Sequence, residues 1–253
     1  MVTTTNIVKH FVDRKGGAVK AVDGVTIEAK PGEIFGLLGV NGAGKTTMLR
    51  MLSTVIKPTG GSATVSGFDV VGQPQKVRGS IGFMSNSTAL YGRLTAAEMI
   101  QYFGELYGME KSRLKERKAY VIEKLNIGEF ADRFCDKLST GQKQRVSIAR
   151  TILHDPPVLF FDEPTAGLDV VSSQTVMEFI EEARTNGKTI IFSTHIMSEV
   201  ERLCDHVAII HEGKIMGEGT VQSLKDQAEE TTSLERAFLK LVKFQSEYAE
   251  AKH

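Results

Sequence analysis

Cysteine is scarce in this sequence, which has Cys135 and Cys204 alone among its 253 residues, and neither stands in a Cys-x-x-Cys pair. Disulfide frameworks and zinc sites need more thiols at closer spacing, so we expect two buried, reduced cysteines. An excess of charge is lacking too, because Lys plus Arg and Asp plus Glu both number 31. Nucleic-acid-binding proteins usually have an excess of basic residues that attracts the phosphate backbone, and this chain has none. We therefore expect no nucleic-acid partner.

Long hydrophobic runs are also missing. The longest apolar stretches, around Val158–Phe161 and Val207–Ile210, have the length of buried strands, whereas about 18 apolar residues are needed to cross a bilayer. The first residues lack the charged and apolar parts of a signal peptide. We therefore expect a cytoplasmic chain, and a role at a membrane would require a separate membrane polypeptide. With 41% hydrophobic and 25% charged residues, the composition is that of a globular protein.

The hydrophobic pattern changes twice along the chain. Residues 5–30 alternate between apolar and polar side chains and predict a small antiparallel sheet with a turn at Gly16-Gly17. Residues 94–150 show helical periodicity, which predicts a helical subdomain. Strands and helices alternate before and after it, and a terminal amphipathic helix is expected at 231–243. Such alternation favours an α/β fold with a mainly parallel, three-layer core.

A glycine-rich loop follows the predicted buried strand at 34–38 and leads into a helix. It matches the pattern G-x-x-x-x-G-K-[ST], which runs from Gly39 to Thr46. Glycines let backbone amides converge on phosphate oxygens, the helix start attracts the anion, Lys45 reaches the β- and γ-phosphates, and Thr46 can bind Mg²⁺. The loop predicts nucleotide binding and leaves NTPase and kinase open. Its expected nucleotide-binding residues are Gly39, Asn41, Gly42, Gly44, Lys45, Thr46 and Thr47.

Two carboxylates, Asp162 and Glu163, follow the apolar run Val158–Phe161. The end of a buried strand is where the ligand crevice of an α/β sheet lies. Asp162 is therefore expected to hold Mg²⁺, and Glu163 to be the general base that activates the attacking water. An Asp-Glu pair without other motifs is usually a solvated strand end. Because a phosphate loop lies upstream, we favour the catalytic interpretation for this pair.

A second helix start, Leu138-Ser139-Thr140-Gly141-Gln142, combines a capping serine with a glycine and can bind another phosphate. Here the sequence resembles the ABC (ATP-binding cassette) ATPase family, whose signature reads Leu-Ser-Gly-Gly-Gln. This chain has Thr140 at the third position, where the family has glycine. The resemblance covers roughly residues 5–220. It implies that Ser139, Gly141 and Gln142 contact the nucleotide of a partner subunit. It also implies a P-loop NTPase (RecA-like) core with an N-terminal antiparallel β-subdomain and the inserted helical subdomain.

Four further residues acquire roles through this resemblance. It implies that Phe11 stacks on adenine, that Asp169 of the D-loop Ala166–Asp169 lies in a dimer interface, and that His195 is the switch histidine that contacts the γ-phosphate. Asn86 stands where the family usually has the glutamine that binds Mg²⁺. Because asparagine is one methylene shorter, direct ligation by Asn86 would need a closer loop or a bridging water. The other histidines match no motif and are expected at the surface.

The resemblance implies an ATP-binding and ATP-hydrolysing subunit of an ABC membrane transporter, with ATP and Mg²⁺ as cofactors. Two copies would dimerise head to tail around ATP and drive a separate integral-membrane subunit, on the inner face of the cell membrane. We expect an ABC ATPase domain at 1–225, with its helical subdomain at about 88–150, and a helical tail at 226–253. The stretches Gly67–Val71 and Ser87–Thr95 look similar to the NatA-type ATPases of sodium exporters. The alternative is a soluble ABC ATPase that acts on ribosomes or DNA.

Overall fold

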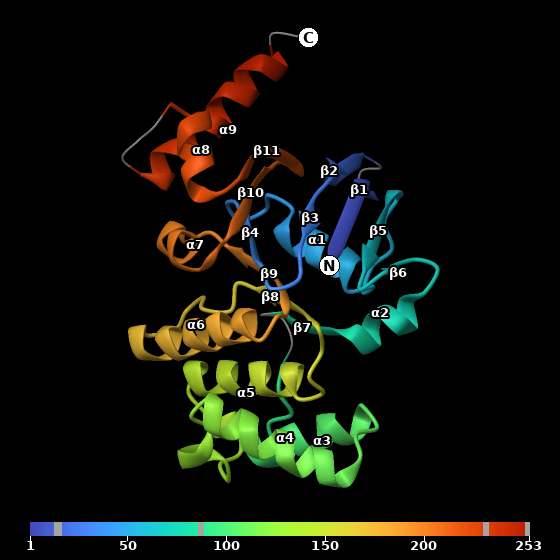
Figure 1. The fold of residues 1–253 in the computed structure, drawn as a ribbon, viewed down its shortest axis with the longest axis vertical. Coiled ribbons are helices and arrows are strands. Elements are labelled where there is room, and N and C mark those ends of the chain that lie inside the picture. Colours follow the sequence, from blue (N-terminus) through green and yellow to red (C-terminus); the bar gives the residue numbers. More distant parts are fainter. Residues whose placement is uncertain (13–16, 86–88, 230–232, 251–253) are drawn as a thin grey trace.

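The computed structural model describes residues 1–12, 17–85, 89–229 and 233–250, with the backbone alone for 244–250. Its strands are β1 (Val2–Val12), β2 (Ala18–Val25), β3 (Glu28–Ala29), β4 (Ile34–Leu38), β5 (Gly60–Val65), β6 (Phe68–Asp69), β7 (Ile81–Ser85), β8 (Val158–Asp162), β9 (Thr189–Thr194), β10 (His206–His211) and β11 (Lys214–Gly219). Its α-helices are α1 (Lys45–Leu52), α2 (Pro74–Ser80), α3 (Ala96–Leu106), α4 (Lys111–Lys124), α5 (Thr140–Ile152), α6 (Val170–Thr185), α7 (Met197–Leu203), α8 (Val221–Gln227) and α9 (Leu234–Glu250). Figure 1 shows these elements.

The central sheet has the strand order β11-β10-β4-β9-β8-β7, and all its neighbours are parallel except β10 and β11. Because successive side chains of a strand point to opposite faces, each buried strand supplies two cores. Leu159 and Phe161 pack in the core that contains α5 and α6, whereas Val158 and Phe160 pack in the core that contains α1. This arrangement confirms the predicted α/β three-layer core.

The N-terminal sheet has the strand order β2-β1-β5-β6, with β3 also paired to β1, and every pairing is antiparallel. Val2 and Ile7 of β1 are buried in the same core as Phe35 and Met48, so this sheet covers α1 and one face of the central sheet. The predicted antiparallel subdomain is thereby confirmed. The predicted turn at Gly16-Gly17 lies partly outside the described residues.

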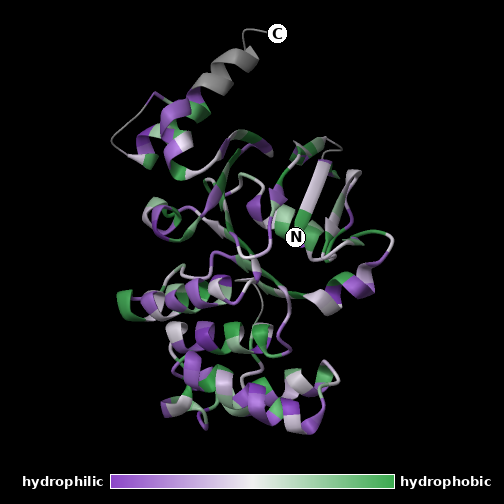
Figure 2. Ribbon diagram, in the orientation of Figure 1, coloured by the Kyte–Doolittle hydropathy of each residue, from purple (hydrophilic) through white to green (hydrophobic). Residues whose placement is uncertain are grey.

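Helices α3, α4 and α5 form the inserted helical subdomain, which lies beyond α6 at one end of the molecule (Figure 1). Thr95 caps α3 in a capping box with Glu98, which satisfies amide groups at the helix start. Met99 and Val121 are fully buried between these helices. Figure 2 shows hydrophobic and hydrophilic segments alternating along α3–α5, as expected of helices with one packed face.

The C-terminal part contains more structure than the sequence predicted. β11 and α8 were not predicted, and both precede the expected tail helix, α9. Ala237, Phe238 and Leu241 of α9 are buried in one core with residues of α7, α8 and β11. The domain boundaries proposed from the sequence stay predictions. In the part of the chain that the structure describes, none of the helices is long and apolar enough to span a membrane.

His154, expected at the surface, is instead partly buried between the helical subdomain and the central sheet. Its ring stacks on Tyr107 with centroids 3.8 Å apart, and its Nε2 lies 3.0 Å from the carbonyl oxygen of Ile81. Burial lowers the pKa of His154 to about 4, so the ring is neutral near pH 7. The expectation was wrong because no local pattern revealed this stacking.

Candidate active site

The phosphate loop lies between the end of β4 and the start of α1, where the parallel strands direct their carboxyl ends. Gly44 has φ +114°, and a Cβ there would lie 2.5 Å from the carbonyl oxygen of Ala21. A Cβ on Gly39 would lie 2.4 Å from the carbonyl oxygen of Ile210. Close packing against backbone therefore requires glycine at both positions, in addition to any approach by phosphate.

Lys45 is held inside this loop and is only 4% exposed. Its Nζ donates to the carbonyl oxygens of Gly39 at 2.7 Å and Val40 at 3.2 Å. It also forms an ion pair with Glu163, at 3.2 Å from Oε1. All three of these partners are oxygen acceptors, so the oxygens of a phosphate group can take their place around the ammonium group.

Asp162, at the end of β8, is hydrogen-bonded by two hydroxyl groups. Thr46 Oγ1 donates to its Oδ1 at 3.1 Å and its Oδ2 at 2.8 Å, and Ser193 Oγ donates to Oδ1 at 2.7 Å. Asp162 is 4% exposed and Ser193 is fully buried. The structure thus brings together two of the three predicted magnesium ligands, Thr46 and Asp162.

Glu163 has φ +51°, a left-handed conformation that is uncommon for a residue with a side chain. Its backbone N–H donates to Ser193, to the carbonyl oxygen at 3.0 Å and to Oγ at 3.2 Å. Its Oε1 lies 3.2 Å from His195 Nδ1 as well as from Lys45. Strained backbone held by neighbouring strands is typical of functional sites, and here it turns the carboxylate toward the phosphate loop.

Ser139 caps α5 as expected, and Gln142 completes a capping box with it. Ser139 Oγ accepts the backbone N–H of Gln142 at 3.2 Å, while the Gln142 side chain accepts the backbone N–H of Ser139 at 3.0 Å. The cavity at the phosphate loop, of about 130 Å³, is lined by Ala21, Asn41–Thr47 and Glu163 and not by the signature. Within one chain, the described contacts therefore do not bring Ser139, Gly141 or Gln142 to the phosphate loop.

Asp169 is the N-cap of α6. Its carboxylate accepts the backbone N–H of Ser172 at 2.9 Å and the hydroxyl of Ser172 at 2.8 Å. The hydrogen bonds from Ser172, chiefly that from its backbone, hold the pKa of Asp169 below its ordinary value. The same cap contacts the signature, because a Cβ on Gly141 would lie 2.5 Å from Ser172 Oγ. Glycine is thus needed at 141 for packing within the chain.

We expect Gly141→Ala to destabilise the fold by about 1–3 kcal/mol, because the added methyl group overpacks α5 against the α6 cap. Chemical denaturation of the nucleotide-free protein measures this. Gly79→Ala in α2 is the matched control, since a Cβ there meets nothing within 4 Å and alanine favours helix. Equal stability of the two variants would contradict the packing role of Gly141.

Four predicted residues remain, of which Phe11, Asn41 and Thr47 are described by the structure and Asn86 is not. Phe11, at the end of β1, is 42% exposed, and Lys9 Nζ lies over its ring, 5.2 Å from the ring centre. Asn41 is exposed and Thr47 is partly buried in the loop and first turn of α1. Asn86 lies outside the described residues.

Sequence reasoning missed two residues that support the site. Ser193 follows three apolar residues in β9, Ile190–Phe192, and its hydroxyl bonds both Asp162 and Glu163. Gln144 Nε2 donates to the carbonyl oxygen of Pro164 at 2.6 Å and so ties the signature helix to the residue after Glu163. The signal for Ser193 was a hydroxyl directly after the apolar run Ile190–Phe192, at the end of the strand that leads to His195. Gln144 gave no signal, because its partner is distant in sequence.

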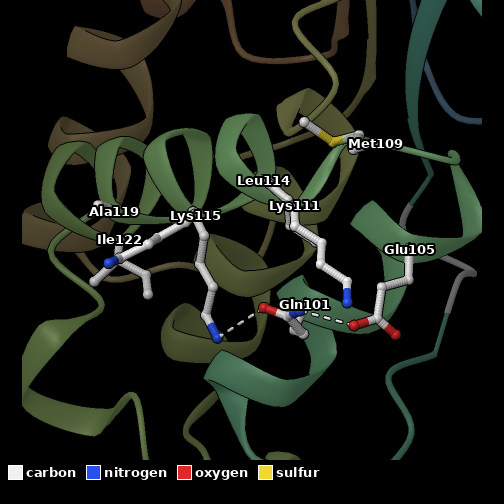
Figure 3. A pocket seen from close by; sticks show the side chains of 9 residues that line it. Gln101, Glu105, Met109, Lys111, Leu114, Lys115, Ala119 and Ile122 are labelled. Carbon is white, nitrogen blue, oxygen red and sulfur yellow. Dashed lines mark hydrogen bonds between the residues drawn. The ribbon is translucent and has the colours of Figure 1, made fainter.

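A larger groove, of about 670 Å³, lies between α3 and α4 (Figure 3). Met109, Leu114, Ala119 and Ile122 contribute apolar surface, and Lys111, Lys115 and Lys118 contribute amines. Size alone therefore does not identify the active site. The phosphate loop is the better candidate, because Lys45, Thr46, Asp162, Glu163 and His195 converge there.

Comparison with known proteins agrees with this geometry. A family model described as "ABC transporter" matches residues 22–166, and a second, described as "AAA domain, putative AbiEii toxin, Type IV TA system", matches 135–201. The ABC transporter ATP-binding protein NatA of Bacillus subtilis (strain 168) is 43% identical over 96% of this chain and 99% of its own. The linearmycin resistance ATP-binding protein LnrL of the same organism is 36% identical over 88% of this chain and 70% of its own.

A solved structure extends the likeness to three dimensions. The ATP-binding cassette MJ0796, in a dimeric post-hydrolysis state bound to ADP and Pi, superposes with a TM-score of 0.79 at 26% identity, over 87% of this chain and 98% of its own. The matched family model, the identity to NatA across nearly both whole chains and the phosphate-loop geometry lead to one conclusion. The chain belongs to the ABC transporter family, as an ATP-binding subunit that hydrolyses ATP.

Proposed function

We propose that the chain hydrolyses MgATP at the phosphate loop of a head-to-tail homodimer. The observation that carries this proposal is the convergence on Glu163 Oε1 of Lys45 Nζ and His195 Nδ1, both at 3.2 Å. A carboxylate, a buried cation and an imidazole at the end of parallel strands form a site for phosphoryl transfer to water.

Each of these residues has a separate task. Lys45 exchanges the carbonyl oxygens of Gly39 and Val40 for the β- and γ-phosphates of ATP, which releases Glu163. Glu163 then accepts a proton from the attacking water. His195, 42% exposed at the loop after β9, donates a hydrogen bond to the γ-phosphate and holds it in line with that water.

Thr46 and Asp162 would hold Mg²⁺. They provide a hydroxyl and a carboxylate, the hard oxygen ligands that Mg²⁺ prefers, and their oxygens already meet at 2.8 Å. No group of three or more His, Cys, Asp or Glu side chains suited to a metal occurs among the residues described. A site completed by substrate phosphates and water fits this donor set. Bound Mg²⁺ neutralises the charge of the phosphates.

The dimer supplies what one chain lacks. Ser139, Gly141 and Gln142 stand at the positive end of α5, away from the phosphate cavity of their own chain. Placed against the phosphate loop of a second copy, this helix start stabilises the γ-phosphate and buries ATP between the subunits. Asp169 would then lie at the interface, as would the turn before it. ATP favours the closed dimer and hydrolysis releases it.

The closed and open dimers are proposed to drive a separate integral-membrane subunit that exports a solute. The chain would then lie on the cytoplasmic face of the membrane. The likeness to NatA and to a resistance ATP-binding protein favours an exporter over the ribosome- or DNA-acting alternative. Sodium is the proposed substrate, from the resemblance of Gly67–Val71 and Ser87–Thr95 to NatA-type ATPases.

Inverted membrane vesicles that contain this chain and its membrane subunit test the proposal. We expect ATP to drive uptake of ²²Na⁺, and Lys45→Met to abolish both uptake and ATP hydrolysis, because the phosphate contacts are lost. Lys57→Met, at an exposed lysine outside the cavity lining, should leave both intact. ATP-dependent uptake of a labelled drug without sodium uptake would contradict the choice of substrate.

A further inference from the structure

A buried carboxylate outside the phosphate cavity joins two of the loops that form the active site. Glu199 lies in the first turn of α7 and is 7% exposed. Its Oε1 accepts the hydroxyl of Thr165 at 2.6 Å, and its Oε2 accepts the hydroxyl of Thr194 at 2.7 Å. Both donors are themselves buried. A carboxylate removed from water depends strongly on such bonds, so the three side chains form one tightly held unit.

The two threonines belong to the segments that carry the proposed catalytic residues. Thr165 follows Glu163 by two residues, and Thr194 directly precedes His195. Thr194 Oγ1 also accepts the backbone N–H of Ile196 at 3.0 Å, so this one hydroxyl fixes the chain on both sides of His195. Glu199 therefore anchors both segments within two residues of their functional side chains.

Thr165 also opens the turn that leads to the proposed dimer interface. Its carbonyl oxygen accepts the backbone N–H of Leu168 at 3.1 Å, and Asp169 follows as the cap of α6. On the other side, the carbonyl oxygen of Thr194 lies 3.4 Å from the backbone nitrogen of Gly39 in the phosphate loop. A displacement of residues 165–169 by a second copy would thus be passed through Glu199 to His195.

We propose that Glu199 is a positioning residue that locks the interface turn, residues 165–169, to the loop of His195, so that dimer closure sets Glu163 and His195 together. The inference rests on the proposed function of those two residues. Loss of the lock leaves the phosphate loop intact, so ATP binding is retained. The relative placement of base and imidazole is lost, so the chemical step is slowed.

Glu199→Gln is the first test, because it preserves the volume of the side chain but leaves one acceptor oxygen where there were two. With the full-length chain we expect kcat to fall by about 10–100-fold, since small misplacements of reacting groups cost that much. The KM for ATP should stay within about threefold, as expected when binding is untouched. An increase in KM with unchanged kcat would overturn the proposal.

A double-mutant cycle separates positioning from general damage. Thr165→Val and Thr194→Val each remove one hydroxyl, and the double variant should have the kcat of the worse single variant, because both act through Glu199. Thr151→Val is the matched control. It removes a buried hydroxyl that bonds only its own helix, at 2.8 Å from the Ser147 carbonyl oxygen, and its kcat should stay within about twofold of the wild type.

Two outcomes contradict the proposal here: fold losses of the two threonine variants that multiply in the double variant, or an equal loss in the Thr151→Val control. Thermal unfolding without nucleotide checks that each variant is folded. If Glu199→Gln does not fold, the cycle of threonine variants tests the proposal in its place. Failure of the proposed function can be distinguished from failure of the proposal for Glu199. It appears as ordinary turnover in Glu163→Gln, whereas the cycle reports on Glu199 whichever residue acts as the base.

Discussion

Glu163→Gln is expected to lower kcat by about 10²–10⁴-fold, the contribution of a positioned general base, while ATP still binds. Glutamine has the shape of glutamate but cannot accept the proton of the attacking water. It also removes a negative charge that lies 3.2 Å from Lys45 in the nucleotide-free chain. The phosphates then meet less competition for this lysine, so ATP binding is retained or strengthened. The dimer, once closed on ATP, cannot reopen through hydrolysis.

Size-exclusion chromatography with MgATP should therefore show Glu163→Gln as a dimer, and a phosphate-release assay should show almost no turnover. Glu229→Gln is the matched control, because Glu229 has the same φ of +51° but follows Ala228, the C-cap of α8, and does not line the phosphate cavity. It should keep wild-type turnover and show no trapped dimer. Ordinary turnover in Glu163→Gln would exclude Glu163 as the base and would return the role to another group at the loop.

The backbone of Glu163 adds a physical reason to expect a large effect. A left-handed glutamate costs about 1–3 kcal/mol, which persists only where the surrounding structure compensates for it. Here the two bonds from its N–H to Ser193 provide that compensation. A glycine at this position would relieve the strain, but it would remove the carboxylate that lies 3.2 Å from Lys45 and His195.

The phosphate loop could be predicted from sequence because its elements are local. Nine consecutive residues from Gly39 define the turn, the cation and the helix start, and the apolar run before Asp162 is also read within a short window. The fold class followed in the same way, from strands and helices that alternate with clear periodicity. Each of these signals comes from a short stretch of consecutive residues, so no tertiary contact was needed to detect it.

Other features could not be predicted because they depend on residues distant in the chain. Gly141 was assigned to ligand contact alone, whereas its packing on Ser172 appears only when α5 and α6 are placed together. Glu199 matched no motif in the sequence, and its partner Thr165 lies 34 residues away. β11 was missed because Lys214–Gly219 contains two glycines and little apolar periodicity.

Ser139→Arg is expected to abolish ATP-dependent dimerisation and turnover without weakening the binding of ATP to one chain. In the described structure, Ser139 contacts Gln142 within its own helix start and not the phosphate cavity of its own chain. An arginine there adds a long cation at the surface that must close over the partner's nucleotide. Its bulk prevents the approach of the α5 amides to the γ-phosphate, so the shared site does not form.

The loss of the helix cap must be separated from the loss of the interface, and this chain offers the control. Thr95 caps α3 with a capping box of the same type, through Glu98. Thr95→Arg and Ser139→Arg should therefore both cost about 0.5–2 kcal/mol of stability. In the Glu163→Gln background, Thr95→Arg should still form the ATP dimer, whereas Ser139→Arg should remain monomeric with an unchanged Kd for ATP. Normal turnover by Ser139→Arg would refute a site shared between two copies, because a chain that completes its own site needs no second helix start.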